Sequence, residues 1–268
     1  MDIVVNPLAG VAANSKASGK WNNLLGYTID RVIYTLGGTF TKAQITNVKV
    51  QANGKTILED TGSRIDTRMQ HRGIAAAAAF LVLDFSEIRA RSIQGQRVGS
   101  IDTVSSGIRD LNVEIDIGAA TSPTLTAIAQ VSAAPQSDPL YNKLIAKVLP
   151  LTANFGAAGE FAVDIPYGRV AGAFIKRVHF FGATVTAARV KKNGIDVWNR
   201  NDALNDFVLG EFQRAPQANC VCIDFIEDGN LTSVHNAANS NTHEWFVTVN
   251  GAGNVTIVCE LLDPLANN

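Results

Sequence analysis

The amino-acid sequence predicts an all-β protein in which one antiparallel β domain occurs twice. Short runs rich in Val, Ile, Thr and Phe recur along the chain, bounded by Gly, Asn and Asp. Two Asn-Gly pairs separate neighbouring runs, and similar segments appear in the same order in both halves. The 268 residues are 46% hydrophobic, which is enough to bury large cores without disulfide bonds.

The expected strands are short and separated by turns. Asn53-Gly54 and Asn193-Gly194 each predict a two-residue hairpin turn, because both residue types tolerate positive φ. The predicted strands of the first half cover residues 29–36, 44–52, 55–59, 78–85, 110–117 and 124–132. Those of the second half cover residues 173–182, 185–192, 195–198, 219–226, 244–250 and 254–262.

One helix is expected between the two halves. An Asp-Pro pair at 138–139 is suited to begin it, and Leu140, Leu144 and Val148 then recur every fourth residue until Pro150. This pattern predicts a helical linker within residues 137–165, between a first domain at 21–136 and a second at 166–268. Residues 1–20 are rich in Ala, Gly, Asn and Ser and predict an extended N-terminal arm.

The internal repeat is the most informative feature of the sequence. Residues 29–34 resemble 175–180 at an offset of 146, and residues 82–87 resemble 222–227 at an offset of 140. The Asn-Gly turns share the offset of 140, and residues 112–118 resemble 245–251. A weaker similarity pairs residues 127–130 with 256–259. A short helical segment follows the hairpin in each half, with Ile65 and Met69 in the first and Leu204 and Val208 in the second, where Gly210 is expected to end it.

Each predicted domain has six to eight strands, which suits a two-sheet sandwich of either immunoglobulin-like or jelly-roll topology. The connections over residues 88–109 and 228–243 are too long for tight turns and are expected to cross between sheets.

Composition excludes several classes of protein. The net charge of −1 excludes a strongly basic DNA-coating protein and an acidic tail. Cys220, Cys222 and Cys259 are too few, and odd in number, for a disulfide scaffold, so we expect buried thiols. Met1 precedes an acidic residue, so we expect no secretory signal. The longest apolar run, residues 74–83, is half the length of a membrane-spanning helix.

No histidine pattern indicates a metal site. His235 and His243 flank a polar loop, where solvated side chains are favoured over metal ligation. His179 aligns with Ile33 in the repeat, which favours a packed histidine. His71 belongs to no recognisable motif.

The other reactive side chains also favour structural roles. Cys220 and Cys222 lie on one face of a strand without further zinc ligands nearby. Asp84 and Asp224 occupy equivalent places in separate copies, which favours hydrogen bonding over a catalytic pair. Arg64, Arg68, Arg72 and the pair Lys191-Lys192 are interpreted as solvated, although Arg64 and Arg68 can share a helix face that forms a weak anion site. Residues 75–79, all Ala, suit either a tight contact between domains or subunits or a plain loop. We therefore predict no catalytic, cofactor-binding or metal-ligating residues.

Several segments resemble a known family. Residues 45–50 leading to Asn53-Gly54, residues 125–132 closing the first copy, the linker, and Asn193-Gly194 with Trp198 follow one another in a similar order there. The sequence resembles the coat proteins of corticoviruses, which are small marine bacteriophages. These belong to the double jelly-roll major capsid proteins of tailless, membrane-containing icosahedral viruses.

The resemblance implies two tandem eight-stranded jelly rolls with a short linking helix and the function of a major capsid protein, not an enzyme. It implies pseudo-hexagonal homotrimers that tile an icosahedral shell over an internal membrane. It also implies contacts with neighbouring trimers, penton proteins and internal membrane proteins, but none with nucleic acid. The protein is then made in the host cytoplasm and resides in the virion. Relatives can hold a structural metal ion between subunits, but no such site maps onto residues here, and no cofactor is expected.

Two alternative functions use the same β sandwiches. A carbohydrate-binding or spike protein predicts exposed aromatic residues on loops, whereas Trp21, Trp198 and Trp245 mostly lie in strand-like runs. A jelly-roll enzyme requires clustered His and carboxylates, which the spacing does not provide.

Overall fold

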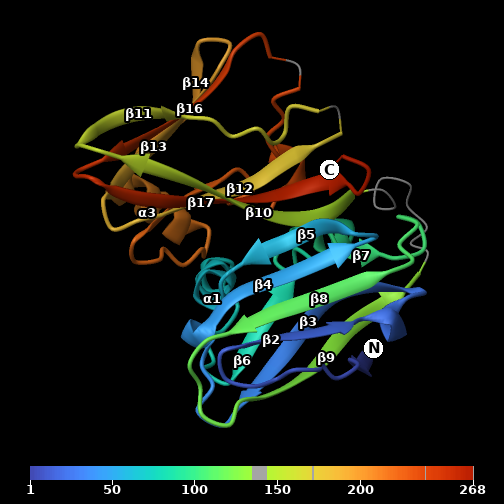
Figure 1. Cartoon of the computed structure of the whole chain (residues 1–268). Helices are drawn as coiled ribbons and strands as arrows, with labels where there is room; N and C mark the ends of the chain where they lie inside the picture. Colours follow the sequence, from blue (N-terminus) through green and yellow to red (C-terminus); the bar gives the residue numbers. More distant parts are fainter. Residues whose placement is uncertain (135–143, 171, 239, 268) are drawn as a thin grey trace. The chain divides into compact units, whose positions relative to one another are not determined.

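The computed structural model describes residues 1–134, 144–170, 172–238 and 240–267. The chain forms two compact units (Figure 1). Unit 1 comprises Met1–Gln70, Ile74–Val148 and Asp263–Asn268. Unit 2 comprises His71–Gly73 and Leu149–Leu262. The prediction of a β-rich double-domain protein is confirmed.

Unit 1 contains a five-stranded sheet and four strands of an eight-stranded sheet. One has the order β1-β9-β3-β6 and the other β5-β4-β8-β2. The first comprises β1 (Asp2–Val4), β9 (Thr124–Ala133), β3 (Tyr27–Gly37) and β6 (Phe80–Asp84), with the short β7 (Ile101–Asp102) also paired to β3. The second comprises β5 (Lys55–Asp60), β4 (Ile45–Ala52), β8 (Leu111–Ile117) and β2 (Ser15–Lys20). Its helices are α1 (Gly62–His71), α2 (Ile93–Arg97) and the 3₁₀ segments η1 (Asn22–Leu24) and η2 (Lys42–Gln44).

Unit 2 repeats this arrangement. One sheet has the order β10-β17-β12-β15 and the other β14-β13-β16-β11. The first comprises β10 (Leu144–Phe155), β17 (Gly253–Pro264), β12 (Phe174–Phe181) and β15 (Cys220–Asp224). The second comprises β14 (Ile195–Asn201), β13 (Val185–Lys192), β16 (His243–Val249) and β11 (Gly159–Val163). Its helices are α3 (Asp202–Glu211) and the 3₁₀ segment η3 (Leu231–Ser233).

The two strand orders correspond one to one, so each unit is the same jelly roll. In both units the chain crosses from one sheet to the other after β6 and after β15, through the long connections expected there. This resolves the choice between immunoglobulin-like and jelly-roll topology in favour of the jelly roll.

Both predicted hairpins form, and they use the same local contacts. Asn53 and Gly54 have φ of 50° and 78°, and Asn193 and Gly194 have φ of 53° and 78°. The side-chain oxygen of each Asn accepts hydrogen bonds from two successive backbone N–H groups. The donors are Arg109 and Asp110 for Asn53, and Asn241 and Thr242 for Asn193. Each Asn therefore sets the turn and also anchors the loop that precedes the next strand.

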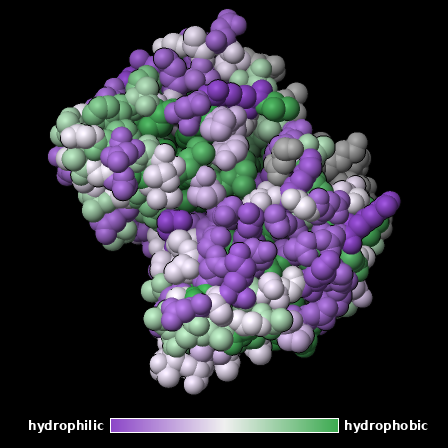
Figure 2. Space-filling view, viewed as in Figure 1, coloured by the Kyte–Doolittle hydropathy of each residue, from purple (hydrophilic) through white to green (hydrophobic). Residues whose placement is uncertain are grey.

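Alternation along the strands places the cores between the sheets. In β8 every second side chain is buried, and β16 follows the same pattern from Trp245 onward. In unit 2, Val178 and Phe180 of β12 belong to one core cluster with Trp245 and Val247 of β16. The outward side chains of β2, β4 and β8 are mainly polar, and Figure 2 shows that face of unit 1 as hydrophilic.

Two predictions about chain organisation are wrong. Residues 1–20 are not an extended arm, because β1 pairs with β9 and β2 pairs with β8 inside unit 1. Residues 144–149 are not helical, because they begin β10, and β11 follows within the predicted linker. The rest of the predicted helix, residues 138–143, lies outside the described residues. Gly210 does not end α3, which continues to Glu211.

Candidate functional site

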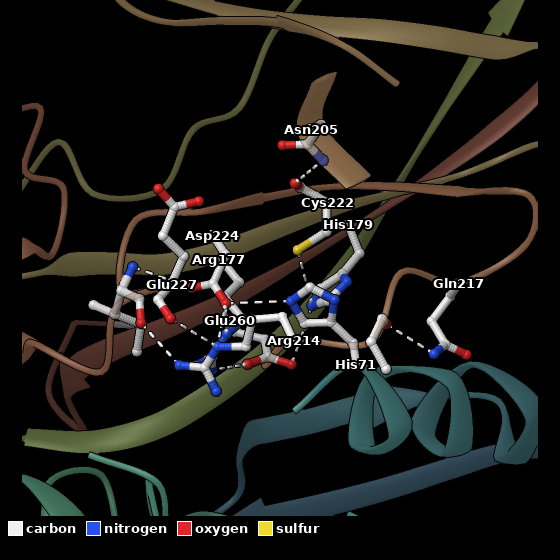
Figure 3. Close-up of polar contacts among 12 residues, drawn as sticks. His71, Arg177, His179, Asn205, Arg214, Gln217, Cys222, Asp224, Glu227 and Glu260 are labelled. Atoms are coloured by element: carbon white, nitrogen blue, oxygen red, sulfur yellow. Dashed lines mark hydrogen bonds and ion pairs between the residues drawn. The ribbon is translucent and has the colours of Figure 1, made fainter. Parts of the chain in front are cut away.

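A cluster of buried charged residues lies on one sheet of unit 2 (Figure 3). Arg177 on the central strand β12 is paired in register with Asp224 at the end of β15 and with Glu260 on β17. Its Nε lies 2.9 Å from Asp224 Oδ2, and its Nη1 lies 3.0 Å from Glu260 Oε2. All three side chains are at least 97% buried.

The end of α1 and the segment that follows α3 cover these two ion pairs. His71, the last residue of α1, places Nε2 3.2 Å from Asp224 Oδ2. Arg214 places Nε 3.4 Å from the same oxygen and donates to the carbonyl oxygens of Ile226 and Glu227. The second oxygen of Asp224 accepts the backbone N–H of Ile226 at 3.1 Å. The Asp224 carboxylate is therefore surrounded by donors.

The electrostatics of Asp224 indicate a structural carboxylate that is ionised at neutral pH. Burial by itself raises the pKa of Asp224, but the Arg177 guanidinium and the hydrogen bond from His71 outweigh burial and hold the pKa below its usual range. The cluster joins three strands, the end of α1 and the segment after α3 through these contacts. Removing one member would leave an uncompensated buried charge.

His179 lies next to this cluster and two thiols. Its ring nitrogens are 3.9 Å from the sulfurs of Cys220 and Cys222, and its Nε2 is 3.4 Å from Glu260 Oε1. Burial raises the pKa of Cys222 well above its usual value, and the charge of Asp224 adds to this. A neutral thiol is a poor nucleophile and a poor metal ligand. The predictions of a packed His179 and of buried, structural cysteines are confirmed.

The other two histidines form a pair that the sequence did not predict. His235 and His243 bring their Nε2 atoms to 2.6 Å, and the ring of His235 stacks on Phe225 at 4.5 Å. Burial lowers the pKa of each histidine to about 4, with smaller contributions from nearby positive charges. The interpretation of His235 as a solvated loop residue is wrong, because it is 91% buried. Among the described residues, no group of three or more His, Cys, Asp or Glu side chains is arranged to hold a metal ion.

In unit 1, Asp84 occupies the position equivalent to Asp224. Its Oδ1 accepts the backbone N–H of Ser86 at 2.9 Å and the Ser86 hydroxyl at 2.7 Å. This matches the Asp224 to Ile226 contact and supports the predicted hydrogen-bonding role of both carboxylates.

The arginines of α1 are not a solvated face. Asp60, fully buried at the end of β5, binds the Nε atoms of Arg64 at 2.5 Å and Arg68 at 3.1 Å. Arg68 and Arg72 are both at least 96% buried. The two positive charges on this helix thus neutralise an internal carboxylate, which leaves no support for the weak anion site considered from the sequence.

The remaining candidates are distributed as follows. Residues 75–79 form a mostly exposed loop, and the strand predicted from residue 78 begins at Phe80. Lys192 donates to the carbonyl oxygen of Asn236, and Lys191 lies above the ring of Phe246.

Trp21, Trp198 and Trp245 are all at least 92% buried, which opposes the carbohydrate-binding alternative because that alternative requires exposed aromatic side chains. In the part of the chain that the structure describes, we find no helix with the length and apolar character needed to cross a bilayer.

Comparisons with known proteins agree with this reading. A family model described as the viral coat protein P2 N-terminal domain matches residues 3–132, and one described as its C-terminal domain matches residues 145–265. No curated protein matches the chain in sequence.

Three solved structures share the fold. The major capsid protein P2 of bacteriophage PM2 is 22% identical with a TM-score of 0.88, covering 100% of this chain and 98% of that chain. The STIV major capsid protein is 12% identical with a TM-score of 0.73, covering 98% and 96%. The PBCV-1 capsid structure is 9% identical with a TM-score of 0.62, covering 98% and 94%.

The buried site and the comparisons lead to the same conclusion. Its charged groups are buried and paired with one another, and the thiols beside them are neutral, as expected of a structural protein and not of an enzyme. The two family models together span most of both jelly rolls. The chain therefore belongs to the viral coat protein P2 family and is a double jelly-roll major capsid protein, a structural component of the virion.

Proposed function

We propose that three copies of this chain form a ring-shaped homotrimer with a nearly sixfold outline, and that these trimers tile an icosahedral shell. The observation that carries the proposal is the repeated jelly roll, in which all eight strands correspond in order. Three chains with two equivalent domains each place six similar blocks around one axis. Such a block packs side by side with its neighbours without large gaps.

The proposed partners are neighbouring trimers, penton proteins and proteins of an internal membrane. The membrane and the penton contacts come from the resemblance to corticovirus coat proteins. A net charge of −1 suits a shell in which like surfaces must lie next to one another.

Measuring the mass of the purified protein in solution tests the trimer. Light scattering after size-exclusion chromatography and native mass spectrometry should both give three times the chain mass of 28.5 kDa. A monomer or dimer at tens of micromolar protein would contradict the proposal. For the shell and its membrane, electron microscopy and lipid analysis of purified particles are decisive. Particles without lipid would remove the membrane from the proposal and leave the trimer intact.

A further inference from the structure

The duplication relates two sites that differ in how they are covered. In unit 2, Arg177 is paired in register with Asp224 and Glu260. In unit 1, Arg31 of β3 is paired in register with Asp84 and Gln130. Both central strands carry the same irregularity, since the register with the adjacent strand shifts just before each Arg. The two arginines therefore occupy the same place in the fold.

The unit 2 site is closed, whereas the unit 1 site is a pocket. His71 and Arg214 cover Arg177, which is fully buried. Over Arg31 the surface is hollowed into a cavity of about 290 Å³, whose lining includes Asp30, Ser86, Arg97 and Gln130. Arg31 is half-buried, and its Nε donates to Gln130 Oε1 at 2.5 Å. Within the described residues no carboxylate forms an ion pair with Arg31.

The segment that covers the unit 2 site has a counterpart elsewhere in the chain. His71–Gly73 follow the α1 residues of unit 1 but belong to unit 2. At the repeat offset of 140, His71 corresponds to Glu211, the last residue of α3. The turns that follow are the same, because Gly73 and Gln213 both have positive φ. The N–H groups of Ile74 and Arg214 then bond back to the helix in matching ways.

The charges at the two sites also differ. In unit 2 the central Arg has two carboxylates and is covered by His71 and Arg214, and the repeat counterpart of Arg214 is the neutral Ile74. In unit 1 the second carboxylate is replaced by the neutral amide of Gln130, and the residue corresponding to His71 is the acidic Glu211. Asp2 and Asp30 also line the pocket, but neither forms an ion pair with Arg31, and Asp30 accepts from the hydroxyls of Ser100 and Ser132. A carboxylate supplied by Glu211 would give Arg31 a charged partner.

We infer that the end of α3 from a second copy of this chain, with Glu211 leading, occupies the pocket over Arg31. Glu211 is exposed and belongs to unit 2, so it is available to another molecule. Two apolar side chains of the same helix end are also exposed, Phe207 at 65% and Phe212 at 38%. Ile88, which lines the pocket, is 49% exposed and provides an apolar surface for them.

A backbone contact extends the correspondence. The N–H of Ala215 donates to the carbonyl oxygen of His71 at 3.1 Å. The residue equivalent to Ala215 is Ala75, the first residue of the exposed Ala loop, and the equivalent acceptor is the carbonyl oxygen of Glu211. The Ala loop is therefore expected to lie at this contact, where its small side chains allow close approach.

This contact is heterologous, because unit 2 of one copy meets unit 1 of the next, and such contacts form a ring when the rotation between successive copies closes. The inference thus rests on the proposed trimer and identifies the surfaces that form it.

Cross-linking between two differently tagged chains tests the inference. One chain carries Arg31→Cys, the other carries Glu211→Cys, and they are co-expressed and treated with a short bismaleimide. The three native cysteines are buried and give little background. A covalent pair containing one copy of each tag is expected, and neither variant expressed alone should yield it. As a matched control, Lys20→Cys replaces Arg31→Cys, since Lys20 is well exposed on the other sheet of unit 1 and should not cross-link.

Charge reversal provides an independent readout. Glu211→Arg changes an exposed residue and should leave the fold intact, while weakening trimer association at least tenfold. Combining it with Arg31→Glu should recover most of that loss. If the wild-type protein is a trimer, but the Arg31→Cys and Glu211→Cys chains do not cross-link and Glu211→Arg does not weaken association, the inference is overturned and the proposed trimer stands. A monomeric wild-type protein would instead refute the trimer, and with it this contact.

Discussion

Replacing Asp224 by Asn tests the structural role assigned to the buried cluster of unit 2. Asn keeps the shape of the side chain, and its oxygen can still accept the N–H of Ile226. The substitution therefore removes little except the negative charge. That charge lies within 3.4 Å of nitrogen atoms on Arg177, His71 and Arg214 at a fully buried position.

The expected loss follows from what remains after the substitution. Breaking one partner of a buried ion pair costs about 3–5 kcal/mol. Because Arg177 keeps Glu260 and Arg214 keeps two carbonyl acceptors, we expect the lower end, about 3 kcal/mol. Glu160→Gln is the matched control. It breaks the pair with Arg189, in which Glu160 is 43% exposed, and should cost less than about 1 kcal/mol.

Thiol labelling measures the unfolding of unit 2 specifically, since Cys220, Cys222 and Cys259 all lie in that unit and are buried. With a urea slope of roughly 1–3 kcal/mol per molar, the labelling midpoint of Asp224→Asn should fall by roughly 1–3 M. The pKa of Asp224 is depressed in the folded state, so its contribution is complete above about pH 4 and is lost as the pH falls below that value. A variant no less stable than Glu160→Gln at pH 7 would refute the assigned role.

Three further predictions concern other parts of the chain. His235 and His243 have folded pKa values of about 4, below the unfolded value of about 6.5. Because the unfolded state then binds protons that the folded state does not, the free energy of unfolding of unit 2 should fall by up to about 1.4 kcal/mol per pH unit for each histidine as the pH falls from 6.5 to 4. His243→Gln should roughly halve that slope in urea titrations, and an unchanged slope would contradict the assignment. Asn193→Ala places Ala at positive φ and removes the acceptor of two backbone N–H groups, so it should lower the free energy of unfolding by about 1–3 kcal/mol in the labelling assay. Gly62→Ala would bring a methyl group within 2.5 Å of the Lys42 carbonyl oxygen and should lower the melting temperature. Gly210→Ala adds a methyl group in open space on α3 and should raise the melting temperature. Equal shifts of the melting temperature in the two variants would refute the packing argument.

The sequence predicted the central strands well and the edge strands poorly, for a physical reason. Central strands such as β3 and β12 have a hydrogen-bonded neighbour on each side and are rich in apolar residues. The missed strands β2 and β11 lie at sheet edges, and β2 has the sequence SKASGK with one buried side chain. Charged and small residues at edges discourage pairing with other chains, and they also hide the strand from pattern analysis.

The wrong helix has a different cause. The spacing of four between Leu144 and Val148 fits a helix face, but four is also an even number and fits one face of a strand. Ile145 and Lys147 between them are buried as well, which a helix with one apolar face does not explain. Lys147 is held by Asp263 at 2.8 Å, a long-range partner that local spacing cannot indicate.

The buried cluster was only partly predictable, and the reason is a shift of one residue. The sequence comparison placed Gln130 opposite Cys259, whereas the strand register makes Glu260 its counterpart, since Arg31 pairs with Gln130 and Arg177 with Glu260. A shift of one residue exchanges the two faces of a strand, so the wrong alignment compares a buried thiol with a site residue. With the correct register, two differences between the copies stand out together. Glu260 is replaced by Gln130 on a strand, and His71 is replaced by Glu211 at a helix end. The inferred contact between copies of the chain, in which Glu211 lies beside Arg31, brings these two differences to one site.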